Sequence, residues 1–558
     1  MQHRFALAAL ALLMVLAVSG TGYAQQPSAL RAGVAAEKIT PFLSPERTVW
    51  LAGYEENRPG TSVYNDLWAR AIAFHDGQRG FVLAVCDLMA FNRVLAQRVR
   101  AGLVESEALK AAGLKPEDVH IAATHTHSAP DTVGLWGPNP ATSGLDPEYI
   151  NFLVSVVIKC VNEAAAGLAP ARLKVATGSA PGLSRNDRFR DILEACGVRD
   201  YASRDIPANV EVLDPEFAAL QVLGPDGSVM ATVVNWACHP EMSHTNVITA
   251  DFPHWLRDRL EQQYGGIAIY WQGAQGGMIT GNSRPDEDID ASERIGLALA
   301  DRVVEALGKG EEVAGAPISA ESKTIKVKME NEGFKAGMEA GVLPMRLTPE
   351  GEIETEVTHI TVGPMEFVTI PGEALPNIGL MLKRHMTGRP RFIIGLCDDE
   401  LGYILAQEDW GLALYEYETS MSVGSTMGRV MGDALLEMIS GTALAAAPAA
   451  SSGEKVQAFF ADLPAKFRPE KAEGVDAVYQ INLTGEGGGQ WNITVRNQQC
   501  VVAQGVAEKP NMTIEADAAD WLKIVAGEMA PTSAVLQGKL KLQPLELGLA
   551  GKFADLFF

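Results

Sequence analysis

The chain of 558 residues is longer than one ordinary domain, so two or more domains are expected. Hydrophobic residues make up 47% and charged residues 21%, which is typical of a globular protein with a large core. The formal net charge of −23 argues against a nucleic-acid partner and against electrostatic docking on anionic lipid, because both need clustered Lys and Arg. It does not exclude an apolar or neutral lipid substrate.

The N-terminal stretch MQHRFALAALALLMVLAVSGTGYAQQ has the parts of a secretory signal peptide. Arg4 supplies a positive start, an apolar run extends from Phe5 to about Val18, and small residues precede a cleavage site after Ala24. The alternative is a membrane anchor, but the run is shorter than the ~20 residues of a spanning helix. We therefore expect residues 1–24 to be removed and the protein to be periplasmic or secreted. No later segment is predicted to cross a membrane.

The six cysteines are widely spread and form no CxxC motif. An exported chain could form one or two disulfides, but sequence alone cannot pair the cysteines. Most of them are expected to be small buried apolar residues. They are Cys86, Cys160, Cys196, Cys238, Cys397 and Cys500.

Residues 25–440 alternate short apolar runs with amphipathic stretches. Strands are predicted at 69–74, 80–91, 119–124, 172–180, 230–240, 266–273, 359–372 and 391–399. Helices, each with glycine at its end, are predicted at 95–113, 147–167, 254–266 and 292–310. This alternation predicts a large α/β (mixed) domain.

The remaining sequence predicts a linker and a second domain. Residues 441–455 are rich in Ala, Pro and Ser and lack periodicity, which is typical of a linker. Residues 456–558 read as a helix, a pair of alternating strands around a glycine-rich turn, and further helices. They predict a small α+β domain.

Two histidines, His125 and His127, follow the apolar run in IAATHTHSAP. If the strand continues through them, both project from one face, because residues i and i+2 of a strand share a face. Neutral imidazole is a good zinc ligand, so the pair is a candidate metal or catalytic site. Two hydrogen-bonded structural histidines are the alternative. The HxHxDH pattern of one class of metal hydrolases is not met, because Asp131 is displaced.

A third histidine, His239, ends another apolar strand in NWACHPEMSH, and His244 and His254 lie nearby. Ligands gather where α/β strands end and loops begin. A hydrolytic zinc needs three or four protein ligands, so a carboxylate should complete the set. Glu373 in FVTIPGEALPN is the candidate, although the residue by itself favours the alternative, a carboxylate stabilised at a helix N-terminus.

Four separated blocks resemble the neutral/alkaline ceramidases in order and approximate spacing, over about residues 30–440. The blocks are THTHSAP, VNWACHPEMS, TIPGEA and LGYILAQEDWGLALYEYETS. The resemblance implies one zinc ion bound by His125, His239, Glu373 and Tyr403. A core tyrosine is the alternative for Tyr403.

The resemblance also implies the catalytic groups of an amide hydrolase. His127 would act as acid and base, Tyr403 and the zinc would stabilise the oxyanion, and Arg185 in SRNDR would hold a polar substrate group. A further tyrosine near the substrate corresponds to Tyr415, with Tyr417 as the alternative register.

One block departs from the family. Where the ceramidases have GDVSPN, this chain has QGAQGGMITGN, so that the serine position falls on Ile279 and the preceding aspartate on Gly277. A zinc-hydroxide mechanism needs no serine, but the change implies a different pocket floor. Three aspartates near apolar runs, Asp66, Asp87 and Asp251, are candidates to support the site or to cap turns.

The C-terminal stretches VYQINLTGEGGGQWNITV, ADAADWLKIVAGEMAP and AVLQGKLKL resemble the sterol carrier protein 2 (SCP2) lipid-binding domains. The resemblance implies an apolar tunnel for acyl or sterol chains, and a structural or oligomerisation module is the alternative. Ceramidases usually end in an immunoglobulin-like domain, so this arrangement is itself a departure.

The sequence therefore predicts an exported zinc amidohydrolase that cleaves ceramide or a related N-acyl amphiphile and makes transient contact with membranes or micelles. A zinc esterase and a non-catalytic lipid carrier are the alternatives. The sequence does not determine the substrate, the ligand of the SCP2-like domain, a secondary Ca²⁺ or Mg²⁺ site, or the oligomeric state.

Overall fold

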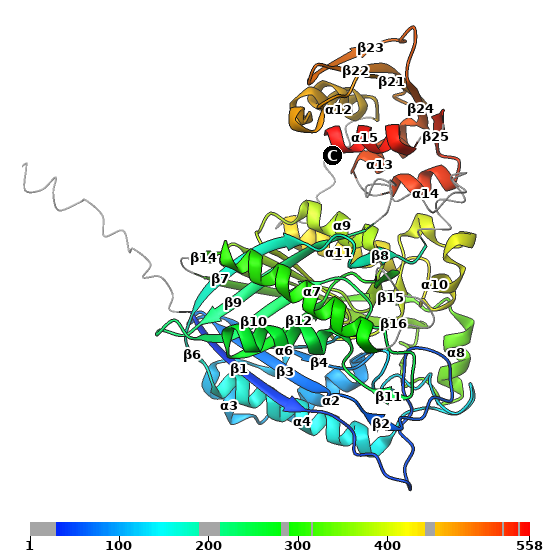
Figure 1. The fold of residues 1–558 in the computed structure, drawn as a ribbon. Coiled ribbons are helices and arrows are strands. Elements are labelled where there is room, and N and C mark those ends of the chain that lie inside the picture. The colour runs from blue at the N-terminus through cyan, green and yellow to red at the C-terminus, as the bar shows by residue number, and fades with distance from the viewer. Residues whose placement is uncertain are drawn as a thin grey trace, which may run out of the picture.

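The computed structural model describes residues 30–188, 213–280, 289–313, 316–440, 452–526, 529–544 and 547–557. Figure 1 shows a large domain and a smaller C-terminal domain. The predicted signal peptide lies outside the described residues, as does the linker prediction up to residue 451. Within the described part, α11 (Met427–Ser440) closes the large domain and α12 (Ser452–Lys466) opens the small one.

The first sheet of the large domain has the order β5-β4-β3-β1-β6. Its pairs are antiparallel except β4 with β5, which is parallel. Three helices accompany it: α2 (Arg93–Leu103), α3 (Glu107–Ala112) and α4 (Pro147–Ala166). The strands are β1 (Arg31–Lys38), β3 (Trp68–His75), β4 (Gly80–Cys86), β5 (Val119–Ala123) and β6 (Ala169–Pro170).

The second sheet has the order β12-β10-β9-β7-β14, with β10 and β12 parallel and the other pairs antiparallel. Helices α6 (Phe252–Tyr264) and α7 (Ile289–Gly308) cover it (Figure 1). The strands are β7 (Arg172–Ser179), β9 (Glu216–Leu223), β10 (Val229–Trp236), β12 (Ile267–Gln272) and β14 (Glu311–Val313).

The two sheets pack face to face between outer layers of helices. Alternate residues of one strand enter different cores: Val233 joins the core between the sheets, and Val234 joins the core under α6 and α7. On the first sheet, Ile72 enters the shared core and Ala71 packs toward α2 and α4. Side chains alternate between the two faces of a strand, so a strand that is buried on both faces needs apolar residues at every position. This explains the continuous apolar runs in the sequence.

Helix α4 is the one described helix long and apolar enough to cross a membrane. Half of its apolar window is buried inside the protein, and its buried residues pack in the core beneath the first sheet. Core helices of folded domains pass the same length and composition test, so the packing makes α4 a core helix.

A third sheet, of order β15-β16-β17-β19, adjoins this body. It is accompanied by α8 (Glu332–Glu339), α9 (Pro376–His385) and α11. Its strands are β15 (Ile318–Lys328), β16 (Glu352–Val362), β17 (Met365–Thr369) and β19 (Arg391–Ile394).

Short strand pairs connect the sheets to the loops around the candidate site. They are β2 (Ser62–Val63) with β11 (Val247–Ile248), β8 (Ser184–Asn186) with β13 (Met278–Thr280), and β18 (Glu373–Ala374) with β20 (Tyr403–Ile404). The short helix α10 (Glu416–Ser420) follows the last of them.

The C-terminal domain is a sheet of order β23-β22-β21-β24-β25 with helices packed on it. Its helices are α12, α13 (Ala518–Ala526), α14 (Pro531–Leu536) and α15 (Leu547–Phe557). Its strands are β21 (Ala477–Thr484), β22 (Gly489–Arg496), β23 (Gln499–Gln504), β24 (Met512–Asp517) and β25 (Leu540–Gln543). The mixed α/β and α+β prediction is confirmed.

Several sequence predictions need correction in detail. The strand predicted at 80–91 ends at Cys86, and the one predicted at 359–372 is the end of β16 followed by β17. The helix predicted at 95–113 is two helices, because the Ser106 side chain caps a new helix by accepting from the Leu109 amide. The strand predicted at 230–240 ends at Trp236. The strand before His125 ends at Ala123, so the two histidines of THTH lie in a loop. The five described cysteines form no disulfide, and Cys196 lies outside the described residues.

Candidate metal centre and active site

Two histidines follow the ends of strands from different sheets. His125 follows β5 with a φ of 73°, a left-handed conformation that is strained for a non-glycine residue, and its amide donates to the Leu88 carbonyl at 2.8 Å. His239 follows β10, and its amide donates to the Met278 carbonyl at 2.7 Å. Gln272 at the end of β12 joins the two loops, because its side-chain amide donates to the Thr124 carbonyl at 3.0 Å and to the Cys238 carbonyl at 2.8 Å.

Glu373 lies between these histidines. One carboxylate oxygen, Oε2, is 3.1 Å from Nε2 of His125 and 3.1 Å from Nε2 of His239. Each histidine uses its other ring nitrogen on a backbone carbonyl: Nδ1 of His125 donates to Met89 at 2.7 Å, and Nδ1 of His239 donates to Met278 at 3.0 Å. These second contacts fix each ring with Nδ1 on a carbonyl and Nε2 toward Glu373, so that Nε2 is the nitrogen that would give up its proton and bind a metal ion.

The spacing of the three donor atoms fits a metal ion. With metal–ligand distances of ~2.0–2.1 Å in a tetrahedral site, neighbouring donor atoms are about 3.3 Å apart. The two observed separations of 3.1 Å agree with that value. Two neutral imidazoles and one carboxylate are also the ligand types that a hydrolytic zinc takes.

The electrostatics of the three side chains favour a cation at this point. Burial by itself would raise the pKa of the Glu373 carboxyl, but the two imidazoles outweigh it and hold that pKa well below its usual range. Burial opposes charge on His239 as well, yet the hydrogen bond and the charge of Glu373 raise its pKa to about 9. Glu373 therefore stays ionised and attracts positive charge toward the two Nε2 atoms.

His127 completes a buried histidine trio whose ligand atoms lie within 4.8 Å of one another. Its ring is 5.0 Å from the ring of His125, and its Nδ1 is buried with no hydrogen-bond partner. Burial and then the neighbouring His125 and His239 lower its pKa well below the usual value. Its backbone is fixed, since its amide donates to Pro240 and its carbonyl accepts from Arg58, each at 3.1 Å. His127 is thus a neutral imidazole with a free nitrogen at the site.

Tyr403 is placed beside Glu373 by the short parallel pair of β18 and β20, in which these two residues are partners. The Glu373 amide donates to the Gly402 carbonyl at 3.0 Å, which fixes this register. Burial and then the charge of Glu373 raise the pKa of the Tyr403 hydroxyl. The four residues expected to bind metal are therefore in one place, with Tyr403 protonated in the absence of an ion.

Two cavities meet at His127, Tyr403 and Tyr417. We call the first the apolar cavity, because Met89, Val133, Leu135, Trp136, Phe334, Leu343, Met345 and Met421 line most of it. We call the second, of about 360 Å³, the acidic cavity. Its charged lining residues are Glu55, Asp187, Arg188, Glu241 and Glu418. A substrate that reaches His127 from both sides would thus have one apolar and one polar part.

The tyrosine after Tyr403 that lines both cavities is Tyr417, whose ring is 5.7 Å from that of Tyr403. Tyr415 is buried instead in a small cluster with Leu375 and Leu405, and it lines a separate small cavity with Asn377. Among the described residues, the structure therefore brings the alternative register to the histidines, and the role predicted for Tyr415 stays a prediction.

Arg185 lies on β8, directly opposite Ile279 of β13. Ile279, at the position of the family's serine, lines the acidic cavity beside His239. The charge of Arg185 reaches this cavity, since it lowers the pKa of Glu241, although burial is the larger effect and raises that pKa to about 7. Arg185 is thus near the site, on the side where the pocket floor departs from the family.

Sequence reasoning gave no role to Glu241, which lines the acidic cavity two residues after His239. Of the three aspartates, Asp251 supports the site: its Oδ2 accepts from the amides of Met242 at 2.8 Å and Ser243 at 3.3 Å, holding the loop after His239. Asp87 forms a buried ion pair with Arg257, and Asp66 pairs with Lys38.

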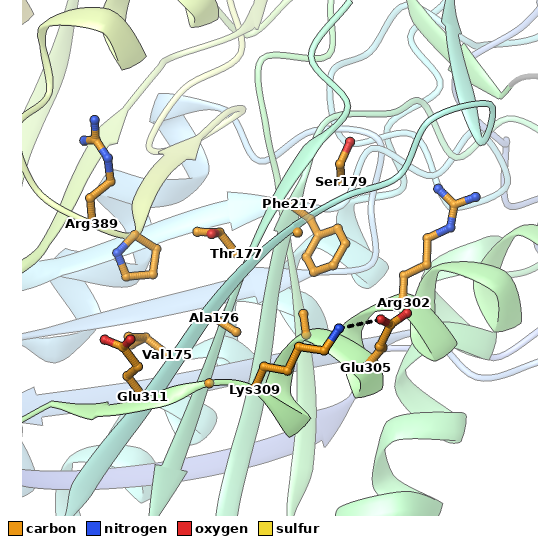
Figure 2. Close-up of a pocket in the computed structure, with 14 residues that line it drawn as sticks. Val175, Ala176, Thr177, Ser179, Phe217, Arg302, Glu305, Lys309, Glu311 and Arg389 are labelled. Atoms are coloured by element: carbon orange, nitrogen blue, oxygen red, sulfur yellow. Dashed lines mark hydrogen bonds and ion pairs between the residues drawn. The ribbon is translucent and has the colours of Figure 1, made fainter. Parts of the chain in front are cut away.

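A further groove of about 600 Å³ lies away from the histidines, between β7 and the C-terminal end of α7 (Figure 2). Arg302, Lys309 and Arg389 line it, and Lys309 pairs with Glu305 at 2.7 Å. The groove shares no lining residue with the apolar or the acidic cavity and has no histidine. The candidate catalytic chemistry therefore belongs to the histidine site.

Fold and site together define an α/β protein with a buried histidine–glutamate centre at its strand ends. Residues 31–191 match the family of neutral/alkaline non-lysosomal ceramidases, N-terminal region, and residues 459–557 match the SCP-2 sterol transfer family. The N-terminal part of the chain thus matches the ceramidase family and its C-terminal part matches the SCP2 family, as the sequence blocks predicted.

Individual relatives agree with this division. A neutral ceramidase of Pseudomonas aeruginosa is 25% identical over 283 residues, which are 47% of this chain and 40% of that protein. The chain thus spans well under half of that relative's length. The crystal structure of neutral ceramidase from Pseudomonas aeruginosa superposes with a TM-score of 0.60 at 19% identity, covering 75% of each chain, which shows a shared fold. A hydroxysteroid dehydrogenase-like protein 2 of Xenopus laevis is 32% identical over 98 residues, 17% of this chain and 23% of that protein.

Proposed function

We propose that the large domain is a zinc-dependent amidohydrolase that cleaves the amide bond of ceramide or a related N-acyl amphiphile. The observation that carries the proposal is the convergence of two Nε2 atoms on one Glu373 oxygen, at 3.1 Å each, beside a neutral histidine. The matched ceramidase family and the 25% identical neutral ceramidase support the reaction class. The protein is further proposed to be exported, on its N-terminal sequence.

His125, His239, Glu373 and Tyr403 would hold the ion, which when bound supplies a water of lowered pKa and polarises a carbonyl. The proton transfer is carried out by a side chain of the protein. His127 takes a proton from the attacking water and passes it to the leaving nitrogen, a role that suits an imidazole kept neutral by its surroundings. In balance, the water oxygen bonds to the carbonyl carbon, the C–N bond breaks, and a carboxylic acid and an amine are released.

The two cavities support an amphiphilic substrate. The apolar cavity, of about 50 Å³, offers an apolar wall to the first carbons of an acyl chain, since Val133, Leu135 and Phe334 line it. Tyr417 lines both cavities, so we assign to its hydroxyl the hydrogen bond to the substrate carbonyl. The SCP2 match supports an apolar ligand for the small domain, and such substrates imply transient contact with membranes or micelles.

The test is a metal assay coupled to matched substrates. Purified protein should contain one equivalent of zinc and hydrolyse an N-acyl amide, and chelation should abolish hydrolysis until zinc is restored. Faster cleavage of the matching ester than of the amide would favour the esterase alternative. Metal-free protein, or activity unaffected by His125→Ala, would contradict the proposal. Fractionation of expressing cells tests export, with residue 25 expected at the N-terminus of the mature protein.

A further inference from the structure

The acidic cavity has an excess of negative charge that its own residues do not neutralise. Among the described residues, its lining contains the carboxylates Glu55, Asp187, Glu241 and Glu418, against one guanidinium, Arg188, and the imidazole of His239 on the side of the metal centre. Arg188 is already shared, because its Nε lies 2.9 Å from Glu418 and its Nη1 lies 3.3 Å from Asp187. It is therefore not available to bind an anionic group of a substrate.

Glu55 has a hydrogen-bond partner of its own. Its carboxylate lies 2.7 Å from Nε2 of His244, at the exposed rim of the cavity. The ring of His244 stacks on that of Tyr54 at 4.3 Å. The carboxylate without a pair of its own is Glu241.

Glu241 faces the cavity with its side chain while its backbone is fixed. The Tyr54 hydroxyl donates to the Glu241 carbonyl, and the structure records no hydrogen bond or ion pair of the Glu241 carboxylate with any described residue. His239 and, to a smaller extent, Arg185 act on the Glu241 carboxylate through space, but no ion pair within 4.0 Å joins it to either among those residues. The charge of Glu241 is also felt at Tyr54, Tyr403 and Tyr417, which together surround the cavity.

A second observation shows that the cavity is built for a ligand at the reacting centre. His127 is only 9% exposed, lines the cavity, and keeps its Nδ1 without a partner. A buried polar atom without a hydrogen bond is unfavourable, so His127 would gain from a ligand or water that supplies the missing partner. The volume of about 360 Å³ is sufficient for a short amine of four or five carbons.

We propose that the acidic cavity binds the amine side of the substrate and selects an N-acylated amine that carries a second, positively charged amino group paired with Glu241. This inference rests on the proposed amide hydrolysis and goes beyond it in naming the substrate class. An ammonium group would pair with the Glu241 carboxylate, whereas a carboxylate, phosphate or sulfate at the same place would meet several like charges.

The test compares three N-dodecanoyl amides that differ in one end group. The amine parts are 1,4-diaminobutane, 4-aminobutanol and 4-aminobutanoate, which are cationic, neutral and anionic, and the assay is run at pH 8. We expect kcat/KM to fall in that order. Glu241→Gln should lower kcat/KM for the cationic amide about tenfold relative to the neutral one, because a close ion pair contributes on the order of one to several kcal/mol. Zinc content should not change.

Glu416→Gln is the matched control, since it removes the same charge from an exposed neighbouring residue that does not line this cavity. Its substrate preference should equal that of the wild type. Equal kcat/KM for the three amides, or a Glu241→Gln variant with unchanged preference, would overturn the inference while leaving amide hydrolysis in place.

Calorimetric titration with free 1,4-diaminobutane separates the inference from the proposed function. Binding that is stronger than that of 4-aminobutanol and is lost in Glu241→Gln supports the cation site even if no amide is hydrolysed. Failure of 1,4-diaminobutane to bind more tightly than 4-aminobutanol overturns the site.

Discussion

At the residue scale, the two histidines of THTH have different surroundings although they are one residue apart. His125 uses Nδ1 on the Met89 carbonyl and presents Nε2 to Glu373. His127 has no partner for Nδ1 and faces both cavities. The first arrangement is that of a metal ligand oriented by a backbone acceptor, and the second is that of a group that exchanges a proton.

This difference predicts distinct variants. His125→Ala should reduce bound zinc to well below one equivalent and abolish turnover. His127→Ala should keep zinc and lower kcat by about 10²–10⁴-fold, the range typical of lost acid–base catalysis. Metal analysis of the dialysed variants together with steady-state kinetics checks both. Zinc loss in His127→Ala would show instead that the histidine trio binds the ion.

A glycine determines where the His127 ring can lie. A Cβ built on Gly53 would lie 2.4 Å from Cγ and 2.8 Å from Cα of His127, and the φ of Gly53 is +106°. Only a residue without a side chain allows this approach with this backbone conformation.

Gly53→Ala should therefore displace His127 and lower kcat at least about tenfold with zinc retained. Gly182→Ala is the matched control, because its φ is also positive, at +77°, but no atom lies within 4 Å of its added Cβ. That variant should lose some stability and keep its activity per folded molecule. Equal losses of kcat in both variants would mean that backbone strain, rather than contact with His127, is responsible.

At the element scale, a short strand pair and side-chain hydrogen bonds bring together site residues that lie beyond the ends of the long strands. The pairing of β18 with β20 brings Glu373 to Tyr403, and Gln272 joins the loops that carry His125 and His239. A second tie, remote from the site, is the ion cluster of Glu216 on β9 with Lys383 of α9 and Arg391 of β19.

The Glu216 cluster predicts a pH dependence of stability. Burial alone would raise the pKa of Glu216, but Lys383 and Arg391 outweigh it, so its pKa lies below the usual 4.5. A carboxyl whose pKa is lower in the folded state stabilises above its unfolded pKa, and this contribution is lost as the pH falls through the folded pKa. Glu216→Gln should therefore be less stable than the wild type at pH 7, with a difference that shrinks below about pH 4.5. Urea unfolding at pH 7 and below about pH 4.5 measures this difference in the free energy of unfolding. A difference that is the same at both would contradict the stabilising role given to the Glu216 carboxylate.

At the scale of the whole molecule, the two domains have separate hydrophobic cores. The residues of the small core, from Val456 to Phe557, join no cluster of the large domain. Phe460 is central to it: its ring stacks at 4.3 Å on Trp491 and at 6.1 Å on Trp521. Separate cores predict that the domains unfold as separate cooperative units.

Phe460→Ala should destabilise the small domain by about 3–5 kcal/mol, the usual cost of removing a buried aromatic ring. Scanning calorimetry should then show one transition moved to lower temperature and one unchanged. Val501→Ala, at a site 61% exposed in the same domain, is the control and should leave both in place. A single transition that shifts as a whole would show that the domains unfold together.

The sequence by itself determined the local features. Runs of buried β-branched and small residues predicted most of the strands and helices, and the placement of His125, His239 and Glu373 at the ends of apolar runs identified the metal-ligand candidates. These features were readable because hydrogen bonding and side-chain alternation within an element depend on neighbouring residues. The pattern did not show that β5 stops at Ala123, because an apolar run does not reveal the turn imposed by the left-handed His125.

Only the tertiary structure decided which strand ends and loops lie next to one another. His239 and Glu373 are 134 residues apart, and the sheet order that unites them is not the order of the sequence. The structure likewise decided that Tyr417 lines the cavities, whereas Tyr415 is buried in a separate cluster. It also showed that Glu241 lines the acidic cavity without an ion pair to any described residue. The physical reason is that the position and charge balance of a cavity are properties of side chains from several elements, and they exist only after packing has brought those elements together.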